Sequence, residues 1–244
     1  MSNRFLKTAS PCEIVRKLVV KAVLDYRLIE AGDKILLAVS GGKDSTSLAY
    51  ALSAAKNEIE AMIGGSFSLH ALHISTDFCS CCKKTPLRLQ LQTWGIDFAD
   101  IFVPVIGRLK PGREMNCYWC STQRRSELLK YAVEHGFSKI ALGHHLDDII
   151  ETYFMNLLEK GKAEGMPVKL AYKKYPVSLI RPLALLEERE IIDCAKELDI
   201  LAAACTCPYG VNSGRKKMRQ KIAAFTNNDG AVKRRIFAAI SSLP

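Results

Sequence analysis

The chain has 244 residues, of which 35 are basic and 25 acidic, so its formal net charge is +10 at pH 7. A hydrophobic fraction of 48% and a charged fraction of 25% are typical of a globular protein and exclude a disordered chain or a fibre. A mean hydropathy of +0.03 excludes a protein with several membrane spans, and the positive charge favours a polyanionic partner.

Helical and strand patterns alternate along the chain. Apolar residues at helical spacing predict a first helix over residues 11–30, and the continuous apolar run over residues 35–39 predicts a fully buried strand. A helix over residues 45–54 follows. The alternation continues with strands at residues 68–75, 101–105, 139–143 and 178–180 and with helices at residues 121–135, 147–159 and 187–198. This order predicts parallel βαβ units, and therefore an α/β fold with a doubly wound, mostly parallel sheet.

The chain divides into three parts by composition and pattern. We expect an N-terminal helical segment at residues 1–30, an α/β domain at residues 31–200 and a short basic C-terminal extension with cysteines at residues 201–244. After Val211 the extension has eight basic residues and one acidic residue, so it holds most of the excess positive charge. A surface of this kind suits a polyanion longer than a nucleotide.

Polar motifs follow three of the predicted strands. They lie at residues 40–45, 75–77 and 143–148, directly after the apolar runs. Because the carboxyl ends of parallel strands meet at one edge of a sheet, where such folds bind their ligands, we expect the three motifs to face one crevice.

The first motif, SGGKDS, consists of Ser40, Gly41, Gly42, Lys43, Asp44 and Ser45. Its two glycines let the backbone approach an oxyanion, and the following helix offers unpaired N–H groups at its N-terminus. The spacing of a Walker loop is absent, and a plain tight turn is the alternative interpretation. The run resembles the PP-loop of the ATP pyrophosphatase superfamily, which binds ATP and cleaves between its α- and β-phosphates. This resemblance implies an adenine nucleotide alpha hydrolase-like fold and ATP as ligand, with Asp44 near Mg²⁺.

Nine cysteines, an odd number, indicate reducing surroundings. The N-terminus has no apolar core of signal-peptide length, and no apolar run is long enough to cross a bilayer. We therefore expect a cytoplasmic protein without membrane contact. Clustered cysteines in that compartment serve metal or redox chemistry rather than a disulfide framework.

Two cysteine pairs are candidates for a metal site. Cys117 and Cys120 form a CxxC motif just ahead of a predicted helix, and Cys205 and Cys207 follow the helix predicted at residues 187–198. Four thiolates would make a structural zinc site, whereas three would hold an Fe–S cluster with one open iron; spacing does not separate the two. A thioredoxin-like dithiol lacks its usual fold context here. A third group, Cys79, Cys81 and Cys82, is interpreted as a sulfur relay, a second metal site or simply buried thiols.

Several separated motifs resemble, in order, the TtcA/TtuA group of tRNA thiolases. They are CYWC at residues 117–120, RR at 124–125, IALGHHLDDIIET at 140–152, NL at 156–157, GK at 161–162, MPVKL at 166–170 and IRPL at 180–183. The resemblance covers about residues 15–221, and its later motifs are similar to the branch that forms 2-thiocytidine. It implies a [4Fe–4S] cluster on Cys117, Cys120 and one downstream cysteine.

The downstream cysteines depart from the pattern of that branch. It usually has CxxC where this chain has Cys205-x-Cys207, and the Cys207-Pro-Tyr run resembles the uridine-thiolating branch instead. We therefore predict Cys207 as the third ligand and keep Cys205 as the alternative. The flanking zinc-finger cysteines of the uridine branch are absent from the sequence, which favours the cytidine branch.

The resemblance also implies roles for residues at the other strand ends. Asp147 and Asp148 would organise ATP, magnesium and the target base, with Asp148 the more important; helix capping is the alternative. Ser75 and Asp77 would contact adenosine, and Gly143 would belong to the nucleotide site. Arg124 would steer ATP or RNA towards the cluster, unless it lies on a solvated helix face. We predict Lys43, Asp44, Asp148 and Arg124 to be catalytic.

These features together predict an ATP-dependent tRNA sulfurtransferase. It would adenylate the C2 carbonyl of a pyrimidine and replace the oxygen by sulfur, most simply forming 2-thiocytidine. Alternatives are a thiolase that forms 2-thiouridine and a zinc-stabilised ATP- and RNA-binding protein without turnover. The expected partners are tRNA, a sulfur donor such as a cysteine desulfurase or sulfide, and a second copy in a homodimer. The tRNA phosphates would bind to a basic surface made of residues 173–174, 215–221 and 233–235.

Overall fold

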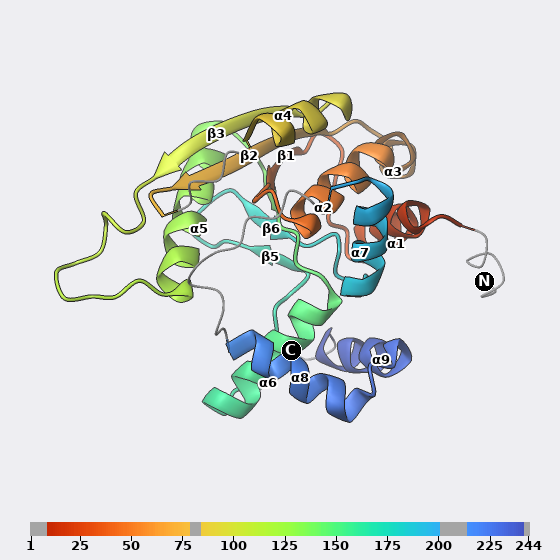
Figure 1. Ribbon diagram of the computed structural model, residues 1–244. Coiled ribbons are helices and arrows are strands. Elements are labelled where there is room, and N and C mark those ends of the chain that lie inside the picture. The colour runs from red at the N-terminus through yellow and green to blue at the C-terminus, as the bar shows by residue number, and fades with distance from the viewer. Residues whose placement is uncertain (1–8, 79–83, 201–213, 242–244) are drawn as a thin grey trace.

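The computed structural model describes residues 9–78, 84–200 and 214–241. Its centre is a six-stranded sheet with the order β3-β2-β1-β4-β6-β5 (Figure 1). The parallel strands are β1 (Lys34–Ala38), β2 (Ser68–Thr76), β3 (Asp97–Val103), β4 (Lys139–Ala141) and β6 (Ser178–Ile180). At one edge, β5 (Lys169–Ala171) pairs antiparallel with β6. The predicted doubly wound, mostly parallel sheet is confirmed.

Helices cover both faces of the sheet. One face carries α1 (Pro11–Asp25), α2 (Lys43–Ala54), α3 (Lys56–Ile63), α4 (Lys84–Thr93) and α7 (Glu188–Glu197), and the other carries α5 (Cys117–Glu134) (Figure 1). Strand β1 shows why its sequence is a continuous apolar run. Ile35 and Leu37 are buried in the cluster with α1 and α2, whereas Leu36 is buried in the cluster with α5. A central strand with both faces covered has no polar side.

Three further helices pack together beyond the carboxyl end of the sheet. They are α6 (Leu146–Lys160), α8 (Gly214–Thr226) and α9 (Gly230–Ser241), and both C-terminal helices contact α6 (Figure 1). Met218, Ile222, Phe237 and Ile240 are buried in the same cluster as the apolar side chains of α1 and β1. The described part of the basic extension is therefore anchored on the α/β domain by its own apolar face.

Some element boundaries differ from the sequence prediction. The first helix ends at Asp25 rather than at residue 30, because Arg27 adopts a positive φ of 46° beyond the C-cap Tyr26. Cys117 and Cys120 lie in the first turn of α5 and not ahead of a helix, since Asn116 caps the helix by accepting a hydrogen bond from the Trp119 N–H. The sequence analysis did not predict α3, α4, α8, α9 or the edge strand β5.

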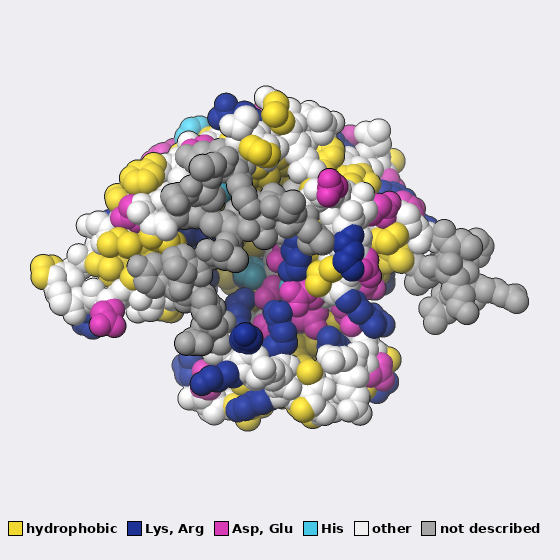
Figure 2. Space-filling view, in the orientation of Figure 1, with side chains coloured by type: hydrophobic (Ala, Val, Ile, Leu, Met, Phe, Trp, Pro, Cys, Tyr) yellow, Lys and Arg dark blue, Asp and Glu magenta, His cyan; other side chains and the backbone are white. Residues whose placement is uncertain are grey.

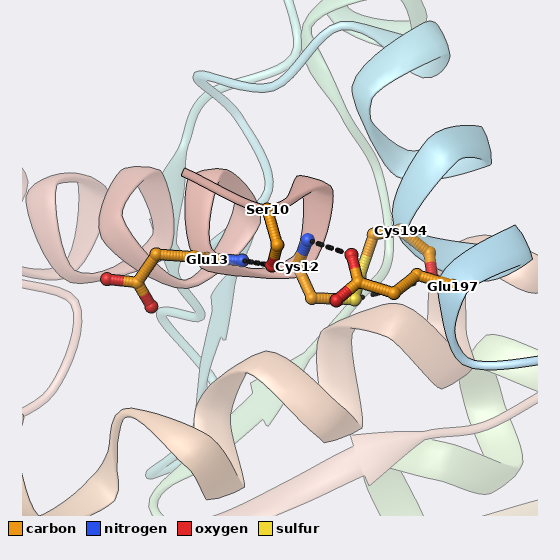
Figure 3. Close-up of a disulfide and its surroundings, with 5 residues drawn as sticks. All are labelled: Ser10, Cys12, Glu13, Cys194 and Glu197. Carbon is orange, nitrogen blue, oxygen red and sulfur yellow. Dashed lines mark hydrogen bonds between the residues drawn. A yellow bond between two sulfur atoms is a disulfide. The ribbon is translucent and has the colours of Figure 1, made fainter. Parts of the chain in front are cut away.

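A disulfide joins Cys12 of α1 to Cys194 of α7 (Figure 3). The Cys12 N–H donates to a carboxylate oxygen of Glu197 at 3.0 Å, so the two helix ends are also joined by a hydrogen bond. The disulfide differs from the expectation that the cysteines stay reduced in the cytoplasm. It forms where α1 packs on α7, a contact between residues 182 positions apart that no local pattern reveals.

Candidate functional site

The loop between β1 and α2 is shaped by its glycines and serines. Gly41 has a φ of +78°, which favours glycine, and Gly42 is the N-cap of α2. The Ser40 N–H donates to the Ser45 hydroxyl at 3.1 Å, and the Gly42 N–H donates to the Ser40 hydroxyl at 3.3 Å. These bonds hold the backbone in a tight turn in front of the N-terminus of α2, as an oxyanion site requires.

Gly143, just after β4, lies directly against this loop. A Cβ at this position would be 2.9 Å from the Ser45 backbone nitrogen and 3.1 Å from the Ser45 Cα. Contacts this short with backbone atoms leave no room for a side chain. Gly143 therefore lets the end of β4 approach the first turn of α2, and it also lines the pocket at the loop.

A pocket of about 360 Å³ opens at the carboxyl end of β1 and β4. It brings together six of the predicted site residues, namely Ser40, Asp44, Ser45, Arg124, Gly143 and Asp148. Two of the three motifs that were predicted to face one crevice, residues 40–45 and 143–148, line this pocket, whereas the motif at residues 75–77 does not. Arg215 of α8 also lines it, a residue that the sequence analysis assigned to the RNA surface.

Two residues predicted to contact adenosine have protein partners instead. The Ser75 hydroxyl donates to the Asp100 carboxylate at 2.7 Å. The Asp77 carboxylate accepts the N–H groups of Ile106 and Gly107 at 3.1 and 2.9 Å and so fixes the loop after β3. Burial opposes ionisation of Asp77, but these N–H groups outweigh it and lower its pKa. Neither residue lines the pocket, and their contact with adenosine stays a prediction.

Helix α5 carries both the CxxC motif and a side chain of the pocket. Cys117 is exposed and Cys120 is half-buried. They are three residues apart in the first helical turn, so both point to one side of the helix. Arg124 follows one turn after Cys120, about 6 Å along the axis, and lines the pocket. Cys205 and Cys207, like Cys79, Cys81 and Cys82, lie outside the described residues.

A cluster of carboxylates and basic side chains lies beside the pocket. Figure 2 shows acidic side chains gathered in the hollow between the sheet domain and the α6, α8 and α9 helices, with Lys and Arg around them. The carboxylate of Glu188 joins α2 to α8, since its Oε1 lies 2.9 Å from Nζ of Lys43 and its Oε2 lies 2.7 Å from Nη1 of Arg219. The remaining ion pairs are Arg215 with Asp148, Arg219 with Glu151, Lys233 with Asp147 and Glu187, and Arg234 with Glu187. We call these residues the carboxylate network.

The network contains part of the predicted RNA surface, whose contact with RNA stays a prediction. Arg215, Arg219, Lys233 and Arg234 pair with carboxylates of the protein, because α8 and α9 pack on α6 and bring these side chains to acidic residues of α6 and of the start of α7. Exposed basic residues that remain for RNA are Lys173, Lys174, Lys216, Lys217, Lys221 and Arg235. The sequence analysis missed Glu151, Glu187 and Glu188, and the one available signal was acidic residues at predicted helix N-termini.

The electrostatics of the pocket favour an ionised Asp148 and a neutral His144. Burial opposes ionisation of Asp148, but His145, His144, Arg215 and the His145 N–H outweigh it and lower its pKa. Burial, with help from Arg181 and Arg215, lowers the pKa of His144 to about 4. Because this pKa lies well below 7, His144 is uncharged at pH 7, and it lines the pocket in that state.

Lys43 has a different environment from the one predicted for it. Its ammonium group pairs with Asp44 and Glu188, both at 2.9 Å, and it does not line the pocket. Burial opposes protonation, but the hydrogen bonds and charges of these two carboxylates raise the pKa of Lys43. Asp147 likewise faces away from the pocket and accepts Lys233 and the Glu188 N–H, both at 2.7 Å. The predicted roles of Lys43 and Asp147 at the nucleotide stay predictions.

A glycine turn between a strand and a helix N-terminus, at the carboxyl edge of a parallel sheet, defines a nucleotide-binding α/β protein. Residues 14–224 match the PP-loop domain family. The chain is 32% identical to tRNA-cytidine(32) 2-sulfurtransferase 1 of Francisella philomiragia subsp. philomiragia, over 94% of this chain and 89% of that protein. It is 35% identical to the tRNA-cytidine(32) 2-sulfurtransferase of Dichelobacter nodosus, over 86% of this chain and 77% of that protein.

Solved structures agree on the fold. The U34-tRNA thiolase NcsA from Methanococcus maripaludis, solved with its [4Fe-4S] cluster, superposes with a TM-score of 0.74 at 25% identity and covers 93% of this chain and 76% of its own. NMN synthetase from Francisella tularensis shares the fold at a TM-score of 0.54, with 16% identity and coverage of 96% and 93% of the two chains. The chain therefore belongs to the PP-loop domain family and, within it, to the family of the tRNA-cytidine(32) 2-sulfurtransferases.

Proposed function

We propose that the protein is an ATP-dependent tRNA sulfurtransferase that forms 2-thiocytidine at position 32. The names of the relatives support the substrate and the position. The observation that carries the proposal is the joint placement of the PP-loop, Arg124 and Asp148 in one pocket, with the CxxC motif one helical turn from Arg124.

The reaction that we propose has two steps. First, the C2 carbonyl oxygen of cytosine attacks the α-phosphorus of ATP, a P–O bond forms, and pyrophosphate leaves with the electron pair. A sulfur nucleophile at the oxidation level of sulfide then adds to C2, and the C–O bond breaks as AMP leaves. Sulfur replaces oxygen without net oxidation or reduction, so no electron donor is needed.

The PP-loop would bind the pyrophosphate portion of ATP. The serine hydrogen bonds and the close approach of Gly143 fix the backbone at the start of α2, whose N–H groups would bind the anion. Fixed N–H dipoles of this kind stabilise the charge that develops on the departing pyrophosphate. Asp148, ionised at neutral pH, would orient the base or the metal, and Arg124 would lie between the nucleotide and the cysteines.

Magnesium would be held jointly by protein and nucleotide. Asp44 and Asp148 line the pocket and supply the oxygen ligands that Mg²⁺ prefers. Among the described residues no group of three or more His, Cys, Asp or Glu is arranged to hold a metal ion. Phosphate oxygens of ATP would complete the coordination, as is usual for magnesium at nucleotide sites.

The residues of α5 fit a [4Fe–4S] cluster. Cys117 and Cys120 share one side of the helix in its first turn, with Cys117 exposed and Cys120 half-buried, and this spacing suits two ligands of one cluster. The third ligand that we propose is Cys207, with Cys205 as the alternative; both lie outside the described residues. A cluster bound by three cysteines supplies an iron with an open position for a sulfur species. The sulfur would come from a cysteine desulfurase or from sulfide.

The remaining exposed basic residues would bind the tRNA backbone. Lys216, Lys217 and Lys221 lie on the outer side of α8, since Met218 and Ile222 face the core. Lys173, Lys174 and Arg235 are exposed as well. Phosphate contacts from such side chains supply affinity without reading sequence. A second copy of the chain in a homodimer would extend this surface.

No described helix could span a membrane, and we propose a cytoplasmic location for the reaction.

A second candidate function is formation of 2-thiouridine. The U34-tRNA thiolase covers 93% of the chain, and the Cys207-Pro-Tyr run resembles the uridine-thiolating branch. Relatives of 30% identity or more carry the cytidine name, so we favour cytidine. Nucleoside mass spectrometry of the thiolated tRNA separates the two products.

The test of the adenylation step is release of AMP and pyrophosphate in the presence of tRNA. We expect both products from the wild type and none from Lys43→Ala or Asp44→Ala. Arg16→Gln is the control, because it removes an arginine from surface carboxylates on α1 and α3. A protein that binds ATP and tRNA but releases no AMP would contradict the proposal.

The test of the cluster is anaerobic purification of the wild type and Cys117→Ala. We expect the wild type to be brown and to contain iron, and the variant to lose both. If both proteins are colourless and bind zinc equally, the zinc-stabilised alternative replaces the cluster.

A further inference from the structure

We propose that Arg215 is a phosphate-binding residue of the ATP site, supplied by the C-terminal extension and oriented by Asp148. The inference rests on the proposed use of ATP and adds a residue to its site. The carboxylate network provides the observation, since Arg215 is the residue of α8 that both belongs to the network and lines the pocket at the PP-loop.

The position of Arg215 is fixed by the packing of α8. The helix begins at Gly214, where a Cβ would contact Met155 and Glu159 of α6 at 3.5 and 4.0 Å. Met218 and Ile222 are buried in the main core. Arg215 precedes Met218 by three residues and so lies near the anchored side of the helix. Its side chain is 41% exposed, which leaves it open to the pocket.

Asp148 holds the guanidinium in place. Its Oδ1 accepts Nη1 of Arg215 at 2.9 Å, and its Oδ2 accepts the His145 N–H at 3.2 Å. The carboxylate is therefore fixed at both oxygens, one of them bound by the N-terminus of α6. This bond uses one of the five N–H donors of the arginine, and a planar guanidinium can bind a second anion with the others.

The charges that line the pocket favour this role. Arg124 and Arg125 of α5 and Arg215 of α8 line the pocket together with Asp44 and Asp148, so three cations meet two carboxylates there. Lys43, the cation of the PP-loop itself, is paired with Asp44 and Glu188 and does not line the pocket. Arg215 would thus supply a positive charge to the triphosphate that the loop lysine does not supply from its present position.

A purely structural role for Arg215 predicts a different result. If the arginine served to fasten α8 to α6, its removal would lower stability and leave phosphate binding unchanged. If it binds phosphate, its removal must weaken ligands with phosphate groups and spare adenosine. The two roles are separated by measuring ligand affinity on the folded protein without tRNA.

The experiment compares the wild type, Arg215→Gln, Arg215→Lys and Arg16→Gln as full chains. Affinities for ATP, pyrophosphate and adenosine are measured by competition with a fluorescent ATP analogue, and folding is checked by thermal melting. Loss of one charge-assisted contact predicts that Arg215→Gln weakens ATP and pyrophosphate about tenfold or more. We expect an intermediate loss for Arg215→Lys, wild-type affinities for Arg16→Gln, and unchanged adenosine binding throughout.

Several outcomes would overturn the inference. Equal ATP affinity of the wild type and Arg215→Gln would do so, as would the same loss in Arg16→Gln or an equal loss for adenosine. Should the variants fail to fold, labelling of wild-type arginines with phenylglyoxal gives the answer. ATP must then protect Arg215 and not Arg16, and equal labelling with and without ATP contradicts the inference. A wild type that binds no ATP refutes the proposed function itself.

Discussion

The PP-loop turn and the carboxylate network face the same hollow, but they are built differently. The turn consists of six consecutive residues, and its hydrogen bonds join positions two to five apart in the chain. The network joins carboxylates at the N-termini of α6 and α7 to basic residues as many as 145 positions away. The turn therefore depends on backbone geometry, whereas the network depends on how α8 and α9 dock.

Because of this difference, changes in the turn and changes in the network should have different effects. Glycines and N–H groups of the turn recognise a phosphate of any nucleotide, and few changes in the turn are compatible with its shape. The network neutralises a group of buried carboxylates and connects the C-terminal extension to the pocket through Arg215 and Asp148. A change in the network should act on stability and on charge before it acts on backbone shape.

Gly143→Ala should give the largest effect. The new Cβ would lie 2.9 Å from the Ser45 nitrogen, so either the turn or β4 must move. We expect a loss of about 1–3 kcal/mol in the free energy of unfolding and at least tenfold weaker ATP binding. Urea titration and ATP titration measure the two. Gly214→Ala is the control, because its nearest neighbour would be 3.5 Å away. Similar behaviour of both variants would contradict the close approach at Gly143.

Glu187→Gln tests the network at one of its two most buried carboxylates. The side chain is 1% exposed and pairs with Arg189, Lys233 and Arg234. Loss of its charge leaves Lys233 with one carboxylate fewer, and we expect a cost of about 1–3 kcal/mol in unfolding free energy. The comparison is Lys21→Ala, which breaks the exposed pair with Asp25 and should cost less than about 1 kcal/mol. Equal costs in urea unfolding would show that burial of the network adds nothing.

Acid should weaken the network in a predictable direction. Lys233 and the Glu188 N–H outweigh burial and hold the pKa of Asp147 below the ordinary value of 3.8. A carboxyl whose pKa is lowered by folding stabilises the protein above its unfolded pKa, and this contribution is lost as the pH falls through the folded pKa. The stability difference between wild type and Asp147→Asn should therefore shrink from pH 7 to about pH 3. A difference that stays constant over this range would refute the ion pair.

The smallest effect concerns RNA binding by the extension. Lys217 is exposed, whereas Arg234 pairs with Glu187. Lys217→Ala should weaken tRNA binding severalfold and reduce the slope of log affinity against log salt by about 1. Arg234→Ala should leave that slope unchanged and lower stability instead. Filter binding at several salt concentrations measures both slopes, and a reversed order would mean that the paired residues contact RNA.

The sequence predicted those parts of the molecule that depend on local pattern. The apolar run of β1 and the SGGKDS turn lie in consecutive residues, and each appears where expected. Asp148 and Arg124, whose roles were implied by the resemblance to tRNA thiolases, both line the pocket. Apolar runs and glycine turns involve only neighbouring residues, so they can be recognised in the sequence itself.

The rest depended on contacts between distant segments. The disulfide forms because α1 packs on α7. Glu188 of α7 pairs with Lys43 of α2 and with Arg219 of α8, two residues that are distant from it in the sequence. The carboxylate of Asp77 accepts an N–H group from a loop 29 residues further on, a contact that the sequence did not indicate, and its predicted contact with adenosine stays untested. Basic residues of the extension looked alike in the sequence, and the docking of α8 and α9 pairs some of them, such as Arg215 and Arg234, with carboxylates of the protein.

The most direct test of the proposed function is the nucleoside content of tRNA from cells that lack the protein. We expect 2-thiocytidine to be absent from that tRNA, to return with the wild-type gene, and to stay absent with Lys43→Ala or Cys117→Ala. Mass spectrometry of tRNA digests measures this modification directly. Unchanged 2-thiocytidine in the deletion strain, or loss of 2-thiouridine in its place, would contradict the assignment to cytidine.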